Sequence, residues 1–396
     1  MVILSGQVAI ARPKSLAELG EVVAKANSVG QIVTVKGGGT KSNFGAPVEN
    51  LDLVIETGAL SALDHAKDDQ TIVVGAGMNF SKLQNQLAKS GQRISLDPPD
   101  RGGKATIGGI LATADCGPLR YRFGSPRELI IGVRIAGAEG AIAHAGGKVI
   151  KNVAGFDLAK LSVGSFGTLG VIGEAAFRLH PLPESRLTFT VEIDPSTALS
   201  AMSKILKSQI EPSAVEYGLG KLTILIEGTE KGAKVQLDAL VKLLATEAYG
   251  AKLEMTESIK DAAIWEHLAT ARSDTRSVGA RIATRVSHLA KIHEAATRCS
   301  GKIKVAVLSH AGSGIHDIIF SGEGSLGDYR SALDAFRNNA AYDSQPLSVR
   351  FAPPQLEELV DLIGIPVPSS VKVMQRVKAS MDPNGRLAPG RFRPWW

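Results

Sequence analysis

The sequence predicts an α+β protein with two domains. Its 396 residues exceed what one ordinary hydrophobic core organises. Helical and strand patterns alternate around glycine-rich turns up to residue 184, where two prolines mark a boundary. Residues 185–255 then follow the order strand, helix, two strands, helix, strand, which is typical of a ferredoxin-like unit. We expect domains at 1–184 and 185–350, the second with an antiparallel sheet, and a C-terminal segment at 351–396.

The composition fits a globular protein and disfavours several other classes. Hydrophobic residues make up 44% of the chain and charged residues 21%. The net charge of +6 is spread along the chain and aromatic residues are only 5%, so no nucleic-acid surface is indicated. We expect no membrane span, because no apolar stretch reaches about 18 residues. The N-terminus lacks the features of a signal peptide, so we expect a cytoplasmic location.

The first subdomain should surround one glycine-rich loop. Residues 15–30 have helical periodicity with Ser15 as N-cap, and residues 31–35 form a β-rich run. The stretch VKGGGTKSNFG (35–45) follows, and another strand is expected at 51–56. The loop therefore lies between two strands of an α/β unit, which we place at about 1–57.

The second subdomain, about 58–184, repeats the association of strands with glycine turns. A strand and turn at 71–78 precede a helix at 79–91, and a hairpin is expected between 128 and 147. Residues 96–125 are rich in Gly, Pro and Thr and lack periodicity. Ordinary connections have about 4–6 residues, so a stretch of this length indicates a functional loop.

The loop GGGTKSNFG has the composition of an anion site. Successive backbone N–H groups in a loop without Cβ atoms form a concave nest for an anion. Thr40, Ser42 and Asn43 add neutral donors, and Lys36 and Lys41 add positive charge. The alternative interpretation is a flexible connection between strands.

Three further glycine-rich stretches favour the anion site. They are GAGM (75–78), KATIGGILATADCG (104–117) and GSFGTLGVIGEA (164–175). Four such loops in one domain suit a long ligand with a pyrophosphate and a flat ring system, because this ligand needs many backbone contacts and little side-chain bulk.

These stretches, with DPNGRLAPGR near the C-terminus, resemble in order and sequence the PCMH-type FAD-binding domain of the vanillyl-alcohol-oxidase type. The stretches RFGSPRELIIGVRIAGAEG and GGKVIKNVAGFDLAKLSVGSFGTLGVI are more specifically similar to FAD-binding subunits of glycolate oxidase. Lys151, Asn152, Gly155, Asp157 and Leu158 are the most telling residues. The resemblance implies a flavin domain of two subdomains, a cap domain, and a C-terminal segment that returns to the flavin domain.

The resemblance also implies which residues bind FAD. They come from the four glycine-rich stretches. They are Lys36, Gly37, Gly38, Gly39, Thr40, Lys41, Ser42, Asn43, Gly75, Gly77, Thr106, Gly108, Gly109, Thr113, Gly164, Gly167, Thr168, Gly170 and Val171.

The same resemblance bears on how FAD is held. Some relatives attach FAD covalently through a His that follows the glycine pair, and Thr40 stands at that position here. We therefore expect noncovalent FAD. Cys116 is a candidate for another covalent link, but a small buried thiol is the favoured interpretation.

Two histidines in SHAGSGIH, His310 and His316, are the candidate catalytic residues. A 2-hydroxy-acid dehydrogenase needs a general base, which is most often a His. Catalytic relatives carry H-A-G-D-G-N-L-H there, and those histidines hold a metal beside the substrate. This chain is one residue shorter and has Ser313 in place of the Asp, so we expect no metal. The alternative is a hairpin that kept its glycines without the chemistry.

The C-terminal stretch departs from the family in one position. Relatives commonly have Asn where Ala388 stands, which counts against full catalytic competence. Arg391 and Arg393 are candidates for contacts to a phosphate or substrate, or for solvated surface residues.

A competing motif lies in the second domain. The stretch GEGSLG (322–327) fits G-x-G-x-x-G, follows an apolar strand and precedes a helix, and Asp343 follows at a suitable distance. A dinucleotide fingerprint requires a parallel βαβ unit, however. The alternative, which we favour, is a glycine turn before a helix at 328–340.

The resemblance implies an FAD-binding subunit of a glycolate oxidase or dehydrogenase complex. Partners would be a catalytic flavoprotein subunit and an iron–sulfur subunit, through which the complex could lie at the inner membrane. The chain has only Cys116 and Cys299, too few to ligate a cluster. Two alternatives stay open: a self-sufficient FAD-dependent D-lactate or glycolate dehydrogenase, and a non-catalytic flavin-binding assembly subunit.

Overall fold

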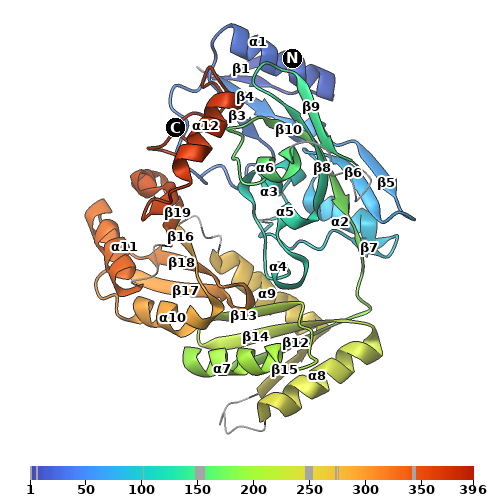
Figure 1. Ribbon diagram of the computed structural model, residues 1–396, viewed down its shortest axis with the longest axis vertical. Coiled ribbons are helices and arrows are strands. Elements are labelled where there is room, and N and C mark those ends of the chain that lie inside the picture. Colours follow the sequence, from blue (N-terminus) through green and yellow to red (C-terminus); the bar gives the residue numbers. More distant parts are fainter. Residues whose placement is uncertain are drawn as a thin grey trace. The chain divides into compact units, whose positions relative to one another are not determined.

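The chain divides into two compact units, coloured along the sequence in Figure 1. The computed structural model describes residues 2–5, 8–100, 102–147, 157–245, 253–272, 274, 276–340 and 345–396. The first unit contains 1–116, 124–182 and 369–396, and the second contains 117–123 and 183–368. Lys151, Asn152 and Gly155 lie outside the described residues.

The first unit begins with a four-stranded sheet in the order β1-β2-β4-β3. The β2–β4 and β3–β4 pairs are parallel, and α1 begins at Ser15, whose side chain accepts from the Glu18 N–H as predicted. The N-terminal hairpin was not indicated by the sequence pattern. The bounds are β1 Val2–Ser5, β2 Val8–Ala11, α1 Leu16–Ser28, β3 Val33–Lys36, β4 Leu53–Glu56 and η1 Thr57–Ala59.

The second subdomain is a five-stranded antiparallel sheet in the order β5-β6-β10-β8-β9. Ile72, Leu83, Ile110 and Phe177 belong to the buried core that the sheet forms with its helices. The stretch 96–125 was expected to be irregular but contains two short helices. The bounds are β5 Leu63–Ala66, β6 Thr71–Gly75, α2 Phe80–Ala88, β7 Gln92–Arg93, α3 Ile107–Thr113, α5 Pro126–Leu129, β8 Ile130–Ala136, β9 Ile142–Gly146, α6 Leu158–Ser162, β10 Val171–Arg178 and β11 His180–Pro181. The other short helix of this stretch, α4 Arg120–Phe123, belongs to the second unit.

The second unit is built on a nine-stranded sheet in the order β15-β12-β14-β13-β17-β18-β16-β19-β20. Every pairing between its strands is antiparallel. The bounds are β12 Ser185–Glu192, α7 Pro195–Leu206, β13 Ala214–Gly218, β14 Lys221–Gly228, α8 Glu230–Ala245, β15 Leu253–Glu257, α9 Ser258–Arg272, β16 Val278–Ala283, η2 Val286–His288, α10 Leu289–Thr297, β17 Lys304–His310, η3 Ala311–Ser313, β18 Ile315–Ser321, α11 Leu326–Ala340, β19 Leu347–Phe351, η4 Pro354–Leu359 and β20 Asp361–Ile365.

This sheet consists of two ferredoxin-like repeats side by side. The first runs β12-α7-β13-β14-α8-β15, and the second runs β16-α10-β17-β18-α11-β19. They meet where β13 pairs with β17, with Tyr217 opposite Ser309. The helices of the repeats pack on one face, whereas α9 lies on the other, as α7 and α9 show in Figure 1. Because β19 and β20 complete this sheet, the predicted boundary at residue 350 moves to 368.

The G-x-G-x-x-G stretch at 322–327 is a turn between β18 and α11. The strand before it, β18, pairs antiparallel with both β17 and β16. A dinucleotide fingerprint needs a parallel βαβ unit, so the glycine-turn interpretation holds. Asp343 lies outside the described residues.

The C-terminal segment belongs to the first unit. After α12, Val371–Met381, the chain turns and runs beside β3. The Val33 N–H donates to the Arg386 carbonyl at 2.9 Å, and the Ala388 N–H donates to the Val33 carbonyl at 2.8 Å. Within the described part of the chain, no helix has the length and apolar character needed to cross a membrane.

A substitution at Ala114 tests the backbone at the end of α3. Ala114 caps this helix with φ of +49°, a left-handed conformation that disfavours a Cβ atom. We predict that Ala114→Gly raises the free energy of unfolding by about 0.5–1 kcal/mol. Urea denaturation measures the change. Ala379→Gly, at an exposed position inside α12, should lower stability by a similar amount. A loss of stability in Ala114→Gly would contradict the assignment.

Candidate functional site: a cavity lined by glycine loops

The first unit contains an open cavity of about 1020 Å³, a volume that includes solvent at its mouth. Its walls are the loop after β3, the start and middle of α3, and the loop before β10. Arg391 from the C-terminal segment also lines it. The predicted residues found in its lining are Lys36, Gly37, Gly38, Gly39, Thr40, Lys41, Ser42, Thr106, Gly108, Gly109, Thr113, Gly167 and Gly170.

The remaining predicted residues lie beside the cavity without lining it. We number the four glycine-rich stretches, 35–45, 75–78, 104–117 and 164–175, as the first to fourth loops. Asn43 belongs to the first loop but does not line the cavity, and Gly75 and Gly77 lie at the end of β6 and just after it. Gly164, Thr168 and Val171 flank the lining glycines of the fourth loop. Cys116 is buried and is not a lining residue either.

The first loop carries backbone N–H groups that have no acceptor among the described residues. Within the described part of the chain, no group accepts a hydrogen bond from the N–H of Gly37, Gly38 or Gly39. A Cβ atom on Gly38 would lie 1.6 Å from the Lys104 carbonyl oxygen, so this loop packs directly on the chain before α3. Gly38 and Gly39 are exposed and Gly37 is half-buried, so this run of donors is open to an external acceptor.

The fourth loop, before β10, has the same property at two positions. No acceptor for the N–H of Gly167 or Gly170 exists among the residues that the structure describes. Gly167 has a φ of +76°, which only glycine adopts without strain. The first and fourth loops together thus present unpaired backbone donors to one cavity.

The glycines of the second loop have a different role. The Gly75 and Gly77 N–H groups already donate to the carbonyls of Ala62 and Leu60, each at 2.8 Å. A Cβ atom on Gly77 would lie 1.9 Å from the Thr57 carbonyl oxygen. These glycines let the end of β6 pack against η1, whose Thr57 lines the cavity. They therefore support the lining without contacting the cavity themselves.

The polar groups of the third loop are also used internally. The Thr106 hydroxyl caps α3 by accepting from the Gly109 N–H at 3.3 Å, and the Gly108 N–H donates to the Ala76 carbonyl at 2.8 Å. The Thr113 hydroxyl donates to the Gly109 carbonyl at 2.8 Å. The third loop therefore contributes part of the cavity surface, but the polar groups named here are bonded within the protein.

The positive charges near the first loop are already paired. Lys36 Nζ lies 3.2 Å from Glu56, and Lys41 Nζ lies 2.8 Å from Asp115. The side chains of Lys41 and Asp115 are only 5% and 6% exposed. The sequence did not single out Asp115, although its place after the threonine-rich stretch 104–114 was visible.

FAD fits this donor set. Its pyrophosphate needs several hydrogen-bond donors at close range, and the first and fourth loops offer unpaired N–H groups free of side-chain bulk. Gly37, Gly38, Gly39 and Gly167 are the residues that would hold the pyrophosphate.

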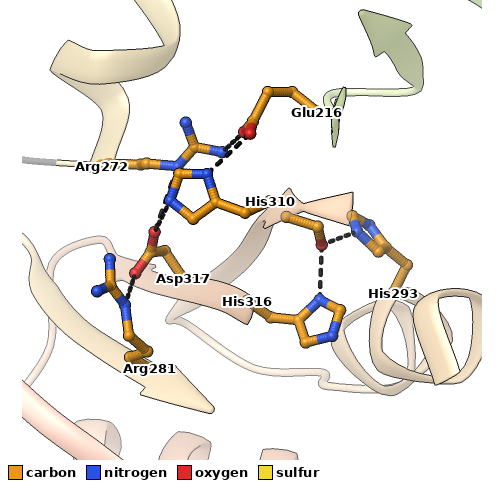
Figure 2. Close-up of polar contacts among 8 residues, drawn as sticks. Glu216, Arg272, Arg281, His293, His310, His316 and Asp317 are labelled. Carbon is orange, nitrogen blue, oxygen red and sulfur yellow. Dashed lines mark hydrogen bonds and ion pairs between the residues drawn. The ribbon is translucent and has the colours of Figure 1, made fainter. Parts of the chain in front are cut away.

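The candidate catalytic residue His310 lies in a buried charged group of the second unit (Figure 2). Its Nδ1 is 2.8 Å from Glu216 Oε1, and Arg272 bonds the same carboxylate. Asp317 lies between Arg272 and Arg281, at 3.3 and 2.7 Å. Burial lowers the pKa of His310, and although burial opposes it, Arg281 holds the pKa of Asp317 well below its usual value.

His316 belongs to a separate polar chain (Figure 2). Its Nδ1 is 2.7 Å from the Ser309 hydroxyl, and its Nε2 is 2.9 Å from the Thr284 hydroxyl. The same Ser309 hydroxyl is 2.8 Å from His293 Nε2. Burial lowers the pKa of His316 to about 3 and that of His293 to about 4.

The sheet directs the two candidate histidines to opposite faces. His316 is paired with Ser309 across β17 and β18, and successive residues of a strand alternate in direction, so His310 faces the other side. The structure therefore does not bring them together. No cluster of His, Cys, Asp or Glu side chains suited to a metal ion occurs among the described residues.

Comparison with known proteins identifies the first unit. Residues 8–146 match the family model described as an FAD binding domain. This part of the chain is an FAD-binding domain. The match covers the first three glycine loops, and the fourth lies beyond it in the same unit.

The curated proteins that are similar to this chain include an oxidase subunit and a dehydrogenase by name. The chain is 33% identical to glycolate oxidase subunit GlcE of Escherichia coli over 213 residues, which is 52% of this chain and 59% of the relative. It is 26% identical to a mitochondrial D-lactate dehydrogenase (cytochrome) of Arabidopsis thaliana, with 83% and 63% covered. The predicted resemblance is thus confirmed. The chain spans about three fifths of the length of these two relatives.

Among solved structures, alkyldihydroxyacetonephosphate synthase is similar in fold. The TM-score is 0.73 at 17% identity, and the match covers 96% of this chain and 75% of the other. This similarity in fold, together with the match of residues 8–146 to an FAD binding domain, confirms the predicted α+β class.

FAD binding should be reversible and nearly independent of salt. Thr40 offers no imidazole for a covalent bond, so denaturation with urea should release all flavin into a filtrate. Because Lys36 and Lys41 are paired, the Kd for FAD should change less than about threefold between roughly 0.05 and 0.5 M NaCl. Fluorescence titration of the apoprotein measures it. Flavin retained after denaturation, or a tenfold weakening by salt, would contradict this description of the site.

The buried histidines predict loss of stability in mild acid. Unfolding raises the pKa of His293 and His316 from about 4 and 3 to ordinary values, so the unfolded chain binds more protons below about pH 6.5. Stability is complete above that pH and falls as the pH drops toward 4, by up to about 2.5 kcal/mol per pH unit.

A variant pair tests this pH dependence by urea denaturation at several pH values. His316→Asn should reduce the slope of unfolding free energy against pH, because one titrating group is removed. His267→Asn, at an exposed position of α9, should leave the slope unchanged. Equal slopes in His316→Asn and the parent chain would show that His316 titrates normally.

Proposed function

We propose that this chain is the FAD-binding subunit of a glycolate oxidase-type complex and acts as an FAD-dependent oxidoreductase on a 2-hydroxy acid. The observation that carries the proposal is the run of unpaired N–H donors at Gly37–Gly39 inside a domain that matches FAD-binding proteins. The similarity to GlcE and to glycolate oxidase subunit GlcD of Bacillus subtilis, 37% identical over 150 residues, supports the substrate class.

The role of the chain's own residues is to hold the cofactor. FAD, when bound, supplies a two-electron acceptor for the oxidation of an alcohol to a carbonyl. The first and fourth loops bind its pyrophosphate with neutral donors, and the tight packing of Gly38 on Lys104 keeps the first loop in place. Excluding side chains from these loops lets the phosphates approach the backbone closely.

The state of the histidines supports a subunit that works with a catalytic partner. His310 bonds Glu216, and both ring nitrogens of His316 lie within hydrogen-bond distance of hydroxyls. Both imidazoles are buried, and burial lowers their pKa. A general base needs access to the substrate and a pKa near the working pH. The base would therefore come from a partner flavoprotein subunit, and an iron–sulfur subunit would receive the electrons.

A self-sufficient D-lactate or glycolate dehydrogenase is the second candidate. The Arabidopsis D-lactate dehydrogenase matches 83% of this chain, including residues of the second unit, which favours activity without partners. In that case another group would take the hydroxyl proton. A non-catalytic flavin-binding assembly subunit is the third possibility.

Anaerobic flavin reduction separates these candidates. The FAD-loaded chain alone should keep its absorbance near 450 nm when glycolate or D-lactate is added, and it should lose this absorbance when the partner subunits are also present. Bleaching of the isolated chain would favour the self-sufficient dehydrogenase. If its flavin stays oxidised even in the assembled complex while the complex turns over glycolate, the chain is an assembly subunit.

A further inference from the structure

The C-terminal segment contacts both loops that carry unpaired N–H groups, the first and the fourth. We call residues 378–392 the clasp. One end contacts the fourth loop through Lys378, and the other contacts the first loop through Arg391. All of these residues lie in the first unit, although about 200 residues of the second unit separate the clasp from the loops in the sequence.

Lys378 ties the clasp to the fourth loop. Its Nζ donates to the Thr168 carbonyl at 2.9 Å, to the Leu387 carbonyl at 2.8 Å and to the Asp382 carboxylate. An ammonium group has three protons, and all three are used. The side chain is buried, and this burial lowers its pKa. Lys378 therefore has no donor left for a ligand and acts on the loop alone.

Asp382 connects the same contact to the first loop. It accepts from the Arg386 N–H at 3.0 Å and from the Leu387 N–H at 2.8 Å, which fixes the turn after α12. Leu387 is buried and forms a bridge with Val33 on β3. The end of β3 leads directly into the glycine loop.

Arg391 holds the far side of the first loop. Its Nη1 donates to the carbonyls of Ser42, Phe44 and Ala46, at 3.3, 3.0 and 3.3 Å. The backbone adds a bond from the Ala46 N–H to the Arg391 carbonyl at 3.2 Å. The clasp thus grips both ends of the first loop, at Val33 before it and at Ser42–Ala46 in its second half.

An aromatic contact adds a second tie to the fourth loop. Phe392 packs edge-on against Phe166 with ring centroids 5.6 Å apart, and Phe166 lines the cavity. Phe166 has a φ of +53°, which is unusual for a bulky residue and persists only where surrounding contacts hold it.

Glycine loops explain why such a clasp would matter for binding. A glycine loses more backbone freedom on ordering than any other residue, so a free glycine loop would lose that freedom when the ligand binds. Fixing the donors beforehand removes this cost from the binding step. Burying the charge of Lys378 is itself unfavourable, which argues that its contacts do more than fill space.

We propose that Lys378 and Arg391 are positioning residues for FAD. They hold the donors of the first and fourth loops in place for a pyrophosphate. The three protons of Lys378 are all used within the protein, whereas Arg391 also lines the cavity. This inference rests on the FAD-binding role of the domain and is independent of which substrate the proposed complex oxidises.

The test is FAD affinity in Lys378→Ala, measured by fluorescence titration of the full-length apoprotein. Loss of a charged hydrogen-bond donor should weaken FAD binding about 10- to 100-fold. Methylammonium added to the solution should restore affinity because it replaces the lost N–H donors, whereas tetramethylammonium, which has none, should not. Lys372→Ala, an exposed position on the same helix, is the matched control and should bind FAD as the parent does.

Arg391 provides an independent variant. Arg391→Met should weaken FAD binding to a similar extent, and Arg391→Lys, which keeps a cationic donor, should recover most of it. Thermal unfolding of each apoprotein is measured in parallel. If Lys378→Ala does not fold, the Arg391 pair decides the question.

Two outcomes would overturn the inference. One is an unchanged Kd for FAD together with lowered apoprotein stability, which would make the clasp a structural tie only. The other is weakened binding that neither methylammonium nor Arg391→Lys restores. Normal FAD binding without reduction by glycolate in the complex would instead contradict the proposed substrate and leave the clasp intact.

Discussion

The cavity of the first unit is built around backbone N–H groups that have no hydrogen-bond acceptor among the described residues. Such groups are costly when buried and are normally paired. Here the buried Gly167 and the exposed or half-buried Gly37–Gly39 present such groups to one cavity. Lys36 and Lys41 are each paired with a carboxylate, and Arg391, which also lines the cavity, donates to backbone carbonyls of the first loop. We therefore propose that the site recognises an anion mainly through its backbone donors.

In the second unit, the two histidines that the sequence suggested as catalytic have structural contacts within the sheet. His310 and Asp317 join Glu216 and two arginines in a charge-balanced group next to the line where the two ferredoxin-like repeats meet. The His316 side chain lies on the opposite face of the sheet, where it contacts the Ser309 hydroxyl. Breaking a buried charged network by removing one partner is strongly destabilising, so these residues have a sufficient structural reason to be present.

Local patterns predicted the elements that depend on local chemistry. Ser15 capped its helix, and the hairpin between 128 and 147 formed, because caps and alternation act over a few residues. The sequence located the four glycine loops but could not show which of them present free N–H groups. Gly75 and Gly77 pack against η1, which only the tertiary structure reveals. The clasp was missed because Lys378 and Thr168 are 210 residues apart. The face of the sheet on which His310 or His316 lies depends on the strand register, and the spacing of the two residues in the sequence does not determine that register.

Amide hydrogen exchange with and without FAD tests the central claim most directly. If unpaired backbone donors hold the pyrophosphate, saturating FAD should slow exchange at Gly37–Gly39 and at Gly167. Gly75 and Gly77, whose N–H groups are already bonded, should change little. Equal exchange in the apo and FAD-bound protein at Gly37–Gly39 would contradict the account.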